Sequence, residues 1–409
     1  MPLSARRRGG VRVVTAGFVL VGGSGFALLA AGPRLLGAAS YSGLALVWTV
    51  SNLFGIGLAA PTEQVVTRGL NANLSDVVRK PMLRLAGVAT IMVTLLLGFA
   101  LSRMNRGDSS GPMLGMALAV AAWVPATWVR GRLAGAGDLV GYGWVLGVES
   151  VVRLSMIAGA IAVRGWAPGL LDLAVGLPVL VAASVGLLFR HAPRNAASEE
   201  RAASVEQLSF VLYAVGFQVC LNGAPLLLQW RIGASQPALV GAFVSASTYF
   251  RMPTLLTGGI LTKSLIDLSH AWGRSNAADF ALFARRGMLQ TTALVAGAIA
   301  LLGIAAPFAL PLYYGRPLRL PVSVIVGLAI STIAAMVAAA AVQPLLAAGR
   351  GNTVAAVWLA GAALTSGVLV AAGDVGTWTA VGLAAGPVFV AGAALVARSK
   401  LLELKGVVG

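Results

Sequence analysis

The residues of this chain that could do chemistry are ionisable and amide side chains placed inside long apolar segments. Arg251 is the strongest case, because it lies in the apolar segment 238–261 with no acidic residue at helical spacing and is followed by Pro253. A proline can open the local hydrogen bonding of a helix backbone. A charged side chain inside a membrane is costly, so it usually faces a cavity or a partner. A guanidinium group offers planar donors suited to a pyrophosphate. Arg251 is therefore interpreted as a substrate contact, or as the partner of an acidic group such as Glu149 on another helix.

A second candidate pair is Glu149 with Arg153, four residues apart near the middle of the apolar segment 139–163. Residues four apart lie on one face of a helix and can form an ion pair. Such a pair lowers the cost of insertion into the membrane and can clamp neighbouring helices. The sequence favours neither the structural role nor a role in the cavity.

Amide side chains recur on one face of the seventh apolar segment, where Gln218, Asn222 and Gln229 follow each other at spacings of four and seven. Sugar recognition needs donors and acceptors of this kind, so this face is a candidate wall of the cavity. The same amides could instead form hydrogen bonds between helices.

Four further charged residues lie closer to the cytoplasmic membrane surface. Glu63 and Arg68 lie near the inner end of the second segment, and Lys263 and Asp267 near the inner end of the eighth. They are candidate gate or headgroup contacts.

No catalytic, metal or cofactor site is predicted. The sequence contains no Walker phosphate loop, no nucleophile elbow and no paired acidic motif in a polar loop. Cys220 is the single cysteine, so a cysteine-rich metal site and an internal disulfide are excluded. His191 and His270 lie in predicted loops. An enzyme is therefore not expected.

The segments that must position these residues are predicted transmembrane helices. Of the 409 residues, 58% are hydrophobic and only 11% are charged, against about 25% charged in an ordinary soluble chain. About 20 apolar residues form a helix that crosses the bilayer, and no alternating pattern of a membrane barrel is present. The fold class predicted is therefore an all-α integral membrane protein. Its twelve predicted spans are 13–31, 44–66, 83–101, 113–129, 139–163, 170–189, 208–228, 238–261, 288–312, 321–346, 354–372 and 378–396.

Lysine and arginine residues indicate the orientation, because cytoplasmic loops retain positive charge during insertion. Most of the 30 basic residues fall on the side that holds Arg6, Arg79, Arg285 and Lys400. Both termini are therefore expected in the cytoplasm. The net charge of +17 is scattered over loops, which excludes a soluble nucleic-acid-binding domain and suits anionic lipid headgroups.

The chain is predicted to form two lobes of six helices each around a central cavity. The N-terminal lobe is 1–190, the polar stretch 191–206 is a cytoplasmic linker, and the C-terminal lobe is 207–409. A weak internal repeat supports this division, because LAGAG after the fourth helix matches LLAAG after the tenth. Repeats related by an axis along the membrane normal are one recognised transporter architecture.

Three motifs resemble polysaccharide flippases of the multidrug/oligosaccharidyl-lipid/polysaccharide exporter superfamily. The run 130–138 (RGRLAGAGD), followed by a helix with Glu149 and Arg153, is similar to their connection between helices four and five. The segment 238–253 (ALVGAFVSASTYFRMP) resembles their eighth helix, and 63–70 (EQVVTRGL) is a weaker match at the end of the second. The resemblance covers most of the chain.

This resemblance implies export of a polyprenyl-pyrophosphate-linked oligosaccharide across the cytoplasmic membrane by alternating access, for cell-surface polysaccharide assembly. Arg251, Arg153, Glu149, Gln218, Asn222 and Gln229 are the candidate substrate contacts. The expected partners are the lipid-linked oligosaccharide, membrane lipids, and a glycosyltransferase or polymerase of the same pathway. Two alternatives stay open: an ion-coupled multidrug exporter that uses Glu149 or Glu63, and a membrane scaffold for polymer assembly that transports nothing.

Overall fold

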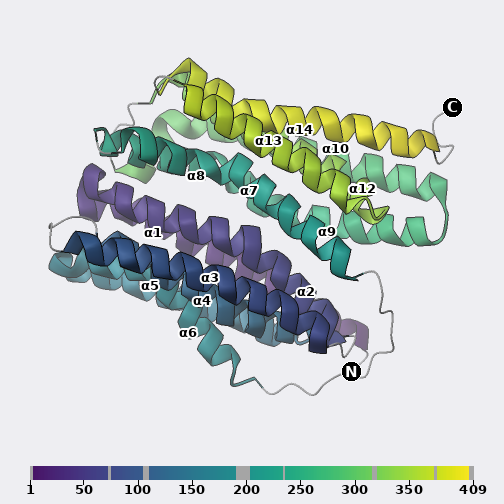
Figure 1. Cartoon of the computed structure of the whole chain (residues 1–409), viewed down its shortest axis with the longest axis horizontal. Helices are drawn as coiled ribbons and strands as arrows, with labels where there is room; N and C mark the ends of the chain where they lie inside the picture. Colours follow the sequence, from purple (N-terminus) through teal and green to yellow (C-terminus); the bar gives the residue numbers. More distant parts are fainter. Residues whose placement is uncertain are drawn as a thin grey trace. The chain divides into compact units, whose positions relative to one another are not determined.

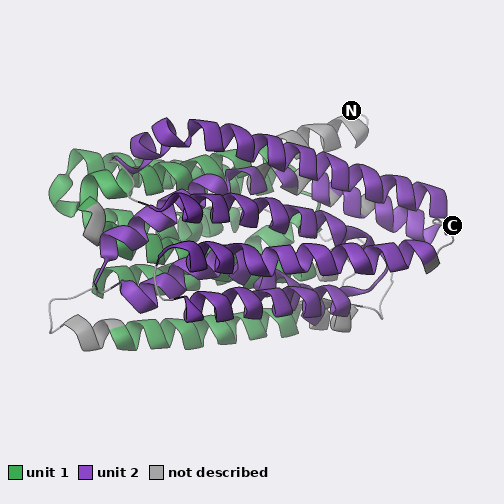
Figure 2. Cartoon of the chain, turned by 90° about the horizontal axis from the view of Figure 1, so that it is seen from above, with its two compact units in different colours: residues 1–207 green, residues 208–409 purple. Residues whose placement is uncertain are grey.

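The computed structural model describes residues 3–71, 75–104, 110–189, 203–233, 235–315, 320–372 and 375–404, and throughout these ranges the secondary structure is helical (Figure 1). The chain divides into two compact units, Met1–Gln207 and Leu208–Gly409 (Figure 2). Most of the predicted linker 191–206, namely residues 191–202, lies outside the described residues.

Unit 1 is a bundle of long helices joined by short connections. Its elements are α1 (Leu3–Phe54), the π-helical turn η1 (Gly55–Ala59), α2 (Ala60–Asn71), α3 (Ser75–Met104), α4 (Ser110–Gly135), α5 (Leu139–Ala162), the 3₁₀ turn η2 (Arg164–Trp166) and α6 (Ala167–Gly186). Within this unit α5 packs against α1 and α6, and α4 packs against α3 and α6.

Unit 2 is a second helical bundle, in which α11 and α13 both pack along α14 and α9 packs along α10. Its elements are α7 (Ala203–Ile232), α8 (Pro237–Phe250), α9 (Met252–Gly273), α10 (Ala277–Tyr314), α11 (Val322–Ala341), α12 (Gln343–Ala347), α13 (Gly351–Ala371) and α14 (Thr377–Leu404). The first residues of α7 precede the unit boundary at Gln207.

Eleven helical segments of the described chain are long and apolar enough to cross a membrane. They correspond one to one with eleven of the twelve predicted spans. The remaining predicted span, 238–261, is divided at Arg251 between α8 and α9, so it is not one continuous helix. The prediction of an all-α, multi-pass membrane protein is confirmed.

The helix α1 contains two of these segments because its backbone turns at Gly37. This residue has φ 74° and ψ 167°, a conformation that glycine adopts without the steric cost that a Cβ brings. The two candidate spans Val13–Gly37 and Ser40–Thr67 lie on either side of it.

The two copies of the predicted repeat end in the same backbone geometry. Gly137 has φ 71° and Gly349 has φ 73°. The backbone nitrogen of Asp138 donates to the backbone oxygen of Leu133 over 2.9 Å. In the second copy, the backbone nitrogen of Arg350 donates to the backbone oxygen of Leu345 over 2.8 Å. Both are the six-to-one bond of a Schellman motif, in which glycine takes the left-handed position. The shared motif supports a structural correspondence between the two units.

Small residues let α4 and α6 approach each other closely. A Cβ added at Gly176 of α6 would stand 2.7 Å from the backbone nitrogen and Cα of Ala119, and one at Gly115 of α4 would stand 3.1 Å from the Cβ of Asp172. Packing through small residues replaces the hydrophobic driving force that is absent between helices in lipid. This contact fixes the positions of α4 and α6, which carry part of the polar cluster described next.

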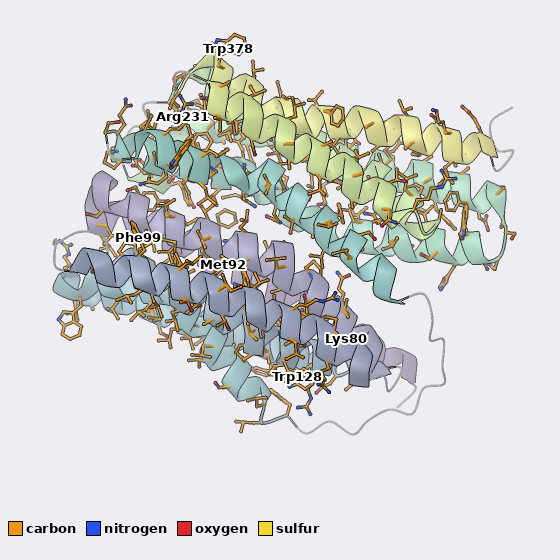
Figure 3. The ribbon with its side chains drawn as sticks, viewed as in Figure 1. Lys80, Met92, Phe99, Trp128, Arg231 and Trp378 are labelled. Carbon is orange, nitrogen blue, oxygen red and sulfur yellow. The ribbon has the colours of Figure 1, made fainter. Side chains whose placement is uncertain are left out.

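Many large apolar side chains point away from the helix contacts. Figure 3 shows side chains of this kind, with Trp378 among its labelled residues. Trp378 is 63% exposed, as suits a residue at the membrane interface.

Candidate functional site

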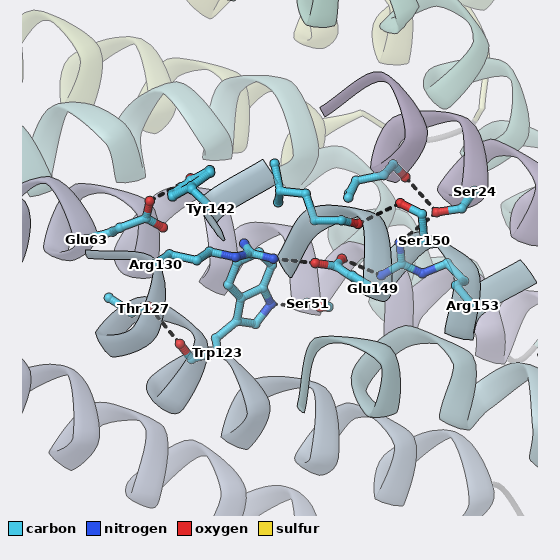
Figure 4. Close-up of polar contacts among 12 residues, drawn as sticks. Ser24, Ser51, Glu63, Trp123, Thr127, Arg130, Tyr142, Glu149, Ser150 and Arg153 are labelled. Atoms are coloured by element: carbon cyan, nitrogen blue, oxygen red, sulfur yellow. Dashed lines mark hydrogen bonds and ion pairs between the residues drawn. The ribbon is translucent and has the colours of Figure 1, made fainter. Parts of the chain in front are cut away.

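A buried ionic cluster in unit 1 is centred on Glu149 of α5 (Figure 4). One carboxylate oxygen accepts a hydrogen bond from Nη2 of Arg153 over 2.8 Å, and the other accepts from Nη2 of Arg130 in α4. The three side chains are at most 6% exposed. Both oxygens of the carboxylate are therefore used by guanidinium groups.

Arg153 also joins α5 to two other helices. Its Nη1 donates to Oγ of Ser24 in α1 over 3.0 Å, and its Nε donates to the backbone oxygen of Ala174 in α6 over 3.1 Å. The guanidinium carbon lies 5.9 Å from the ring centroid of Trp48. With all three of its nitrogens engaged, this arginine acts as a cross-link inside unit 1.

Arg130 lies over an aromatic ring that is itself held in place. Its guanidinium carbon is 5.3 Å from the ring centroid of Trp123, within the range of a cation–π contact. The indole Nε1 of Trp123 donates to Oγ of Ser51 over 3.1 Å. The Nε of Arg130 is buried, and no described group accepts from it.

Glu63 of α2 extends the cluster toward the end of the bundle. Its Oε1 accepts a hydrogen bond from the hydroxyl of Tyr142 over 2.7 Å. Thr67, one turn later, donates its hydroxyl to the backbone oxygen of Glu63 over 2.8 Å. The side chain of Arg68, the other predicted contact at this end, lies outside the described residues.

The second polar cluster belongs to unit 2 and is built at a helix break. Arg251 stands between α8 and α9 with φ −94° and ψ −2°, and Pro253 lies in the first turn of α9. The backbone nitrogen of Arg251 donates to the oxygens of Ser247 and Thr248, while its oxygen accepts from the nitrogen of Thr254 over 3.0 Å. The span predicted as one helix is thus divided next to Pro253, with Arg251 between the two helices.

The guanidinium group of Arg251 has only one hydrogen bond to a described residue. Its Nη1 donates to Oδ1 of Asn222 over 2.7 Å. Its Nε and Nη2 are buried and have no partner among the described residues. Asn222 in turn donates its amide to Oε1 of Gln218. Gln218, Asn222 and Arg251, all three predicted site residues, are therefore linked by consecutive hydrogen bonds.

The other predicted residues of unit 2 lie outside this chain of hydrogen bonds. Oε1 of Gln229 is buried and finds no donor within the described part of the chain. Lys263 and Asp267 form an ion pair one turn apart, with side chains 76% and 29% exposed. Lys263 is well solvated, and Asp267 is half-buried.

The structure therefore shows which residues Glu149 and Arg251 contact, where the sequence analysis left alternatives open. Glu149 bonds to Arg153, as its spacing indicated, and also to Arg130, which the sequence analysis counted only among its similarity motifs. The hydrogen-bond partner of Arg251 among the described residues is Asn222 rather than an acidic group. Sequence reasoning also missed Tyr142, because no helical periodicity relates it to Glu63.

The residues that the structure describes contain no group of three or more His, Cys, Asp or Glu side chains that could hold a metal ion. The two clusters instead consist of arginines with carboxylate, amide or aromatic neighbours. Their chemistry is that of binding and charge compensation.

Sequence comparison finds no relative: no family model and no curated protein matches this chain. Solved structures do match it over nearly its whole length. An inward-facing multidrug resistance MATE family transporter of the MOP superfamily matches with a TM-score of 0.70 and 13% identity, over 96% of both chains. An outward-facing transporter of this description matches with a TM-score of 0.64 and 15% identity, over 98% of this chain and 97% of the other.

A third similar structure is a MOP superfamily transporter from Pyrococcus furiosus, reported with a reversed polarity of its binding pocket that suggests a different function. It matches with a TM-score of 0.66 and 14% identity, over 98% of this chain and 97% of the other. At these identities the comparisons show the fold: the chain has the fold of MOP superfamily transporters.

Proposed function

We propose that this protein is a transporter that exports a polyprenyl-pyrophosphate-linked oligosaccharide across the cytoplasmic membrane. The observation that carries the proposal is the guanidinium group of Arg251, which lies at a helix break inside a predicted span with two nitrogens lacking described partners. The MOP transporter fold supports the transport part of the proposal, and the arginine supports an anionic substrate.

The two unpartnered nitrogens of Arg251 define the kind of anion that fits. Nε and Nη2 form one edge of the planar guanidinium group, and Nη1 on the other side is held by Asn222. Two parallel donors on one edge match two oxygens of a phosphate or carboxylate. Such charge-assisted hydrogen bonds contribute about 1.5 to 3 kcal/mol each. A pyrophosphate would satisfy donors that are otherwise buried without partners.

The helix break adds a second feature that favours a negative charge. α9 begins at Met252, directly after Arg251, and the positive end of a helix dipole lies at its first turn. Transporters use interrupted membrane helices in this way at their substrate sites. The backbone and side chain at residue 251 thus favour the same type of ligand.

The amides of α7 supply the chemistry that an oligosaccharide needs. Gln218 and Asn222 hold one side of Arg251, and Gln229 has a buried oxygen that lacks a described donor. Sugar hydroxyls donate and accept hydrogen bonds, so they can satisfy amide groups of this kind. In the proposed mechanism the polyprenyl tail stays in the bilayer while the two units alternate access to the headgroup. A glycosyltransferase or polymerase of the same pathway supplies or consumes this substrate.

An ion-coupled multidrug exporter is the second candidate, because two of the similar structures are reported as multidrug resistance transporters. In this case Glu63 would be the coupling carboxylate, since both oxygens of Glu149 are bound by arginines. A cationic drug would be repelled by Arg251. This repulsion makes the lipid-linked oligosaccharide the better fit.

The test measures the sidedness of lipid-linked oligosaccharide in cells depleted of this protein and of any redundant flippase. The cells are rescued with the original chain, Arg251→Ala, Arg251→Lys or the control Arg231→Ala. Arg231 is a matched control because it is a half-buried arginine of unit 2 whose Nη1 donates to the backbone oxygen of Leu369 over 2.8 Å. Drug sensitivity is measured in the same strains.

Depletion is expected to accumulate the substrate on the cytoplasmic leaflet, and the original chain and Arg231→Ala should cure it. Arg251→Ala is expected to lower the export rate by about tenfold to a hundredfold, as the loss of a charge-assisted hydrogen bond predicts. Arg251→Lys keeps the charge but loses the two-donor edge, so it should rescue only in part. Unchanged sidedness in depleted cells contradicts the proposal. Altered drug sensitivity would then support the second candidate, and an assembly defect without either effect would support a scaffold.

A further inference from the structure

Asp172 is a buried acid of unit 1 that neither polar cluster uses. It lies in α6, is 7% exposed, and belongs to a candidate span, Arg164–Gly186. No described residue forms a hydrogen bond or ion pair with its carboxylate. In this it differs from Glu149, whose two oxygens both accept from arginines. An unpaired carboxylate inside a membrane span is costly when ionised.

The carboxylate of Asp172 is wedged against the start of α4. Its Oδ2 would lie 3.4 Å from a Cβ added at Gly111, the second residue of α4, and its Cβ would lie 3.1 Å from one added at Gly115. One turn further along α6, a Cβ added at Gly176 would lie 2.7 Å from the backbone of Ala119. Asp172 therefore lies within the close contact between α4 and α6.

The charged groups of the elements packed against α6 either bind residues other than Asp172 or lie at other positions along their helices. In α5 Glu149 and Arg153 bind each other, and Arg130 near the far end of α4 binds Glu149. Arg34 of α1 donates to the backbone oxygen of Ala30. The remaining described charged groups of these elements are Arg132 in the last turn of α4 and Arg164 in η2, which is exposed.

Two opposing effects act on this carboxylate. Burial favours the neutral, protonated form, whereas the nearby first turn of α4 favours the negative form. Their opposition narrows the free-energy difference between the two forms, which is what a reversible proton site requires. Gain or loss of the proton changes the charge inside a close helix contact, so it biases how tightly α4 and α6 pack.

We infer that Asp172 is a proton-binding site, whose occupancy sets the tightness of the α4–α6 contact in unit 1. The inference is independent of which substrate is transported. A proton taken up here from the side on which α4 and α6 begin provides a means of coupling conformational change to a proton gradient.

The test uses the purified full-length protein and a hydrophobic carbodiimide, which reacts with protonated carboxyl groups in apolar surroundings. Modified residues are located by mass spectrometry from mildly acidic to mildly alkaline pH. Asp172 is expected to be modified at low pH, with the yield falling about tenfold for each pH unit above the midpoint. Glu149 is the internal control and should stay unmodified, because two guanidinium groups hold it ionised. Asp172→Asn should abolish the labelled site.

A second measurement is needed in case the carbodiimide cannot reach Asp172 inside the contact between α4 and α6. The unfolding temperature of the original chain is compared with that of Asp172→Asn over the same pH range. The original chain should match the variant at low pH and become less stable than it as the pH rises, because only the original carboxyl can ionise. Absence of labelling together with parallel unfolding profiles overturns the inference. Neither readout involves transport, so the result does not depend on the function proposed above.

Discussion

Glu149 shows how a single side chain can determine the stability of unit 1. Its carboxylate is bonded to two buried guanidinium groups, and its removal leaves both without this counter-charge. We predict that Glu149→Gln lowers the free energy of unfolding by about 3 to 5 kcal/mol, as is typical when one partner of a buried ion pair is lost. Denaturant unfolding of the purified protein measures this change.

The matched control for this prediction is Asp267→Asn in unit 2. It also breaks an ion pair four residues apart, but its partner Lys263 is 76% exposed. Solvated pairs contribute little, so the control should change stability by no more than about 0.5 kcal/mol. Equal effects of the two substitutions would contradict the structural role given to Glu149.

Residue-level interpretation from the sequence succeeds where partners are close along a helix. Glu149 and Arg153 are four apart, and so are Gln218 and Asn222, and both pairs are bonded in the structure. Arg130 precedes Glu149 by 19 residues on another helix, and no periodicity connects them. The sequence analysis therefore includes Arg130 only in a similarity motif. Only the packing of α4 against its neighbours reveals the ion pair.

At the scale of the element, α6 offers a direct test of close helix packing. A Cβ at Gly176 would stand 2.7 Å from the backbone of Ala119, whereas a Cβ at Gly169 would meet nothing within 4 Å. We predict that Gly176→Ala destabilises the protein by about 1 to 3 kcal/mol through overpacking. Gly169→Ala should be neutral or stabilising by up to about 1 kcal/mol, because alanine is the better helix former.

Thermal unfolding of the two variants in the same detergent distinguishes these outcomes. Both substitutions add one methyl group to the same helix, so a difference between them reports on the contact with α4 rather than on helix propensity. Similar unfolding temperatures would show that α4 and α6 adjust freely to a larger side chain.

The sequence predicts helices well but the interruptions within them less well. Hydropathy identifies 238–261 as one span, while the structure breaks it at Arg251 into α8 and α9. Pro253 signals the break, yet proline also occurs inside continuous helices such as α4 and α6. Whether a proline interrupts a helix depends on what satisfies the freed backbone groups, and that depends on neighbouring helices.

At the scale of the whole molecule, the predicted orientation can be tested with the single native cysteine removed. Cys220 is fully buried, so Cys220→Ala provides a background for introduced thiols. We predict that Ser235→Cys, before α8, reacts with a membrane-impermeant thiol reagent added outside intact cells. Ser269→Cys, near the end of α9, should react only after the cells are opened, because the segment containing α8 and α9 crosses the membrane. Both serines are exposed.

Labelling of both cysteines from the outside would place α8 and α9 on one side and contradict the orientation derived from the basic residues. Labelling of Ser269→Cys alone would reverse it. The introduced thiols thus examine the one predicted span that no single helix of the described chain accounts for.

Charge and hydropathy are the sequence features that predict the fold of the whole molecule. They predict the all-α membrane fold, because the cost of burying polar backbone in lipid leaves no other choice in a chain this apolar. The repeat of LAGAG and LLAAG also survives as matching turns at Gly137 and Gly349. Substrate identity is not predicted in this way, since it depends on few side chains, such as Arg251, whose partners come from different helices.

The uneven distribution of charge between the two clusters has an electrical consequence. In the Glu149 cluster of unit 1 the charges of Glu63, Arg130, Glu149 and Arg153 sum to zero when all four are ionised, while Arg251 in unit 2 has no described acidic partner. A unit charge that crosses the full membrane exchanges about 2.3 kcal/mol per 100 mV with the transmembrane potential. The membrane voltage therefore exerts a net force on the cation of the Arg251 cluster and almost none on the Glu149 cluster, until an anion of the kind proposed above binds and cancels the positive charge.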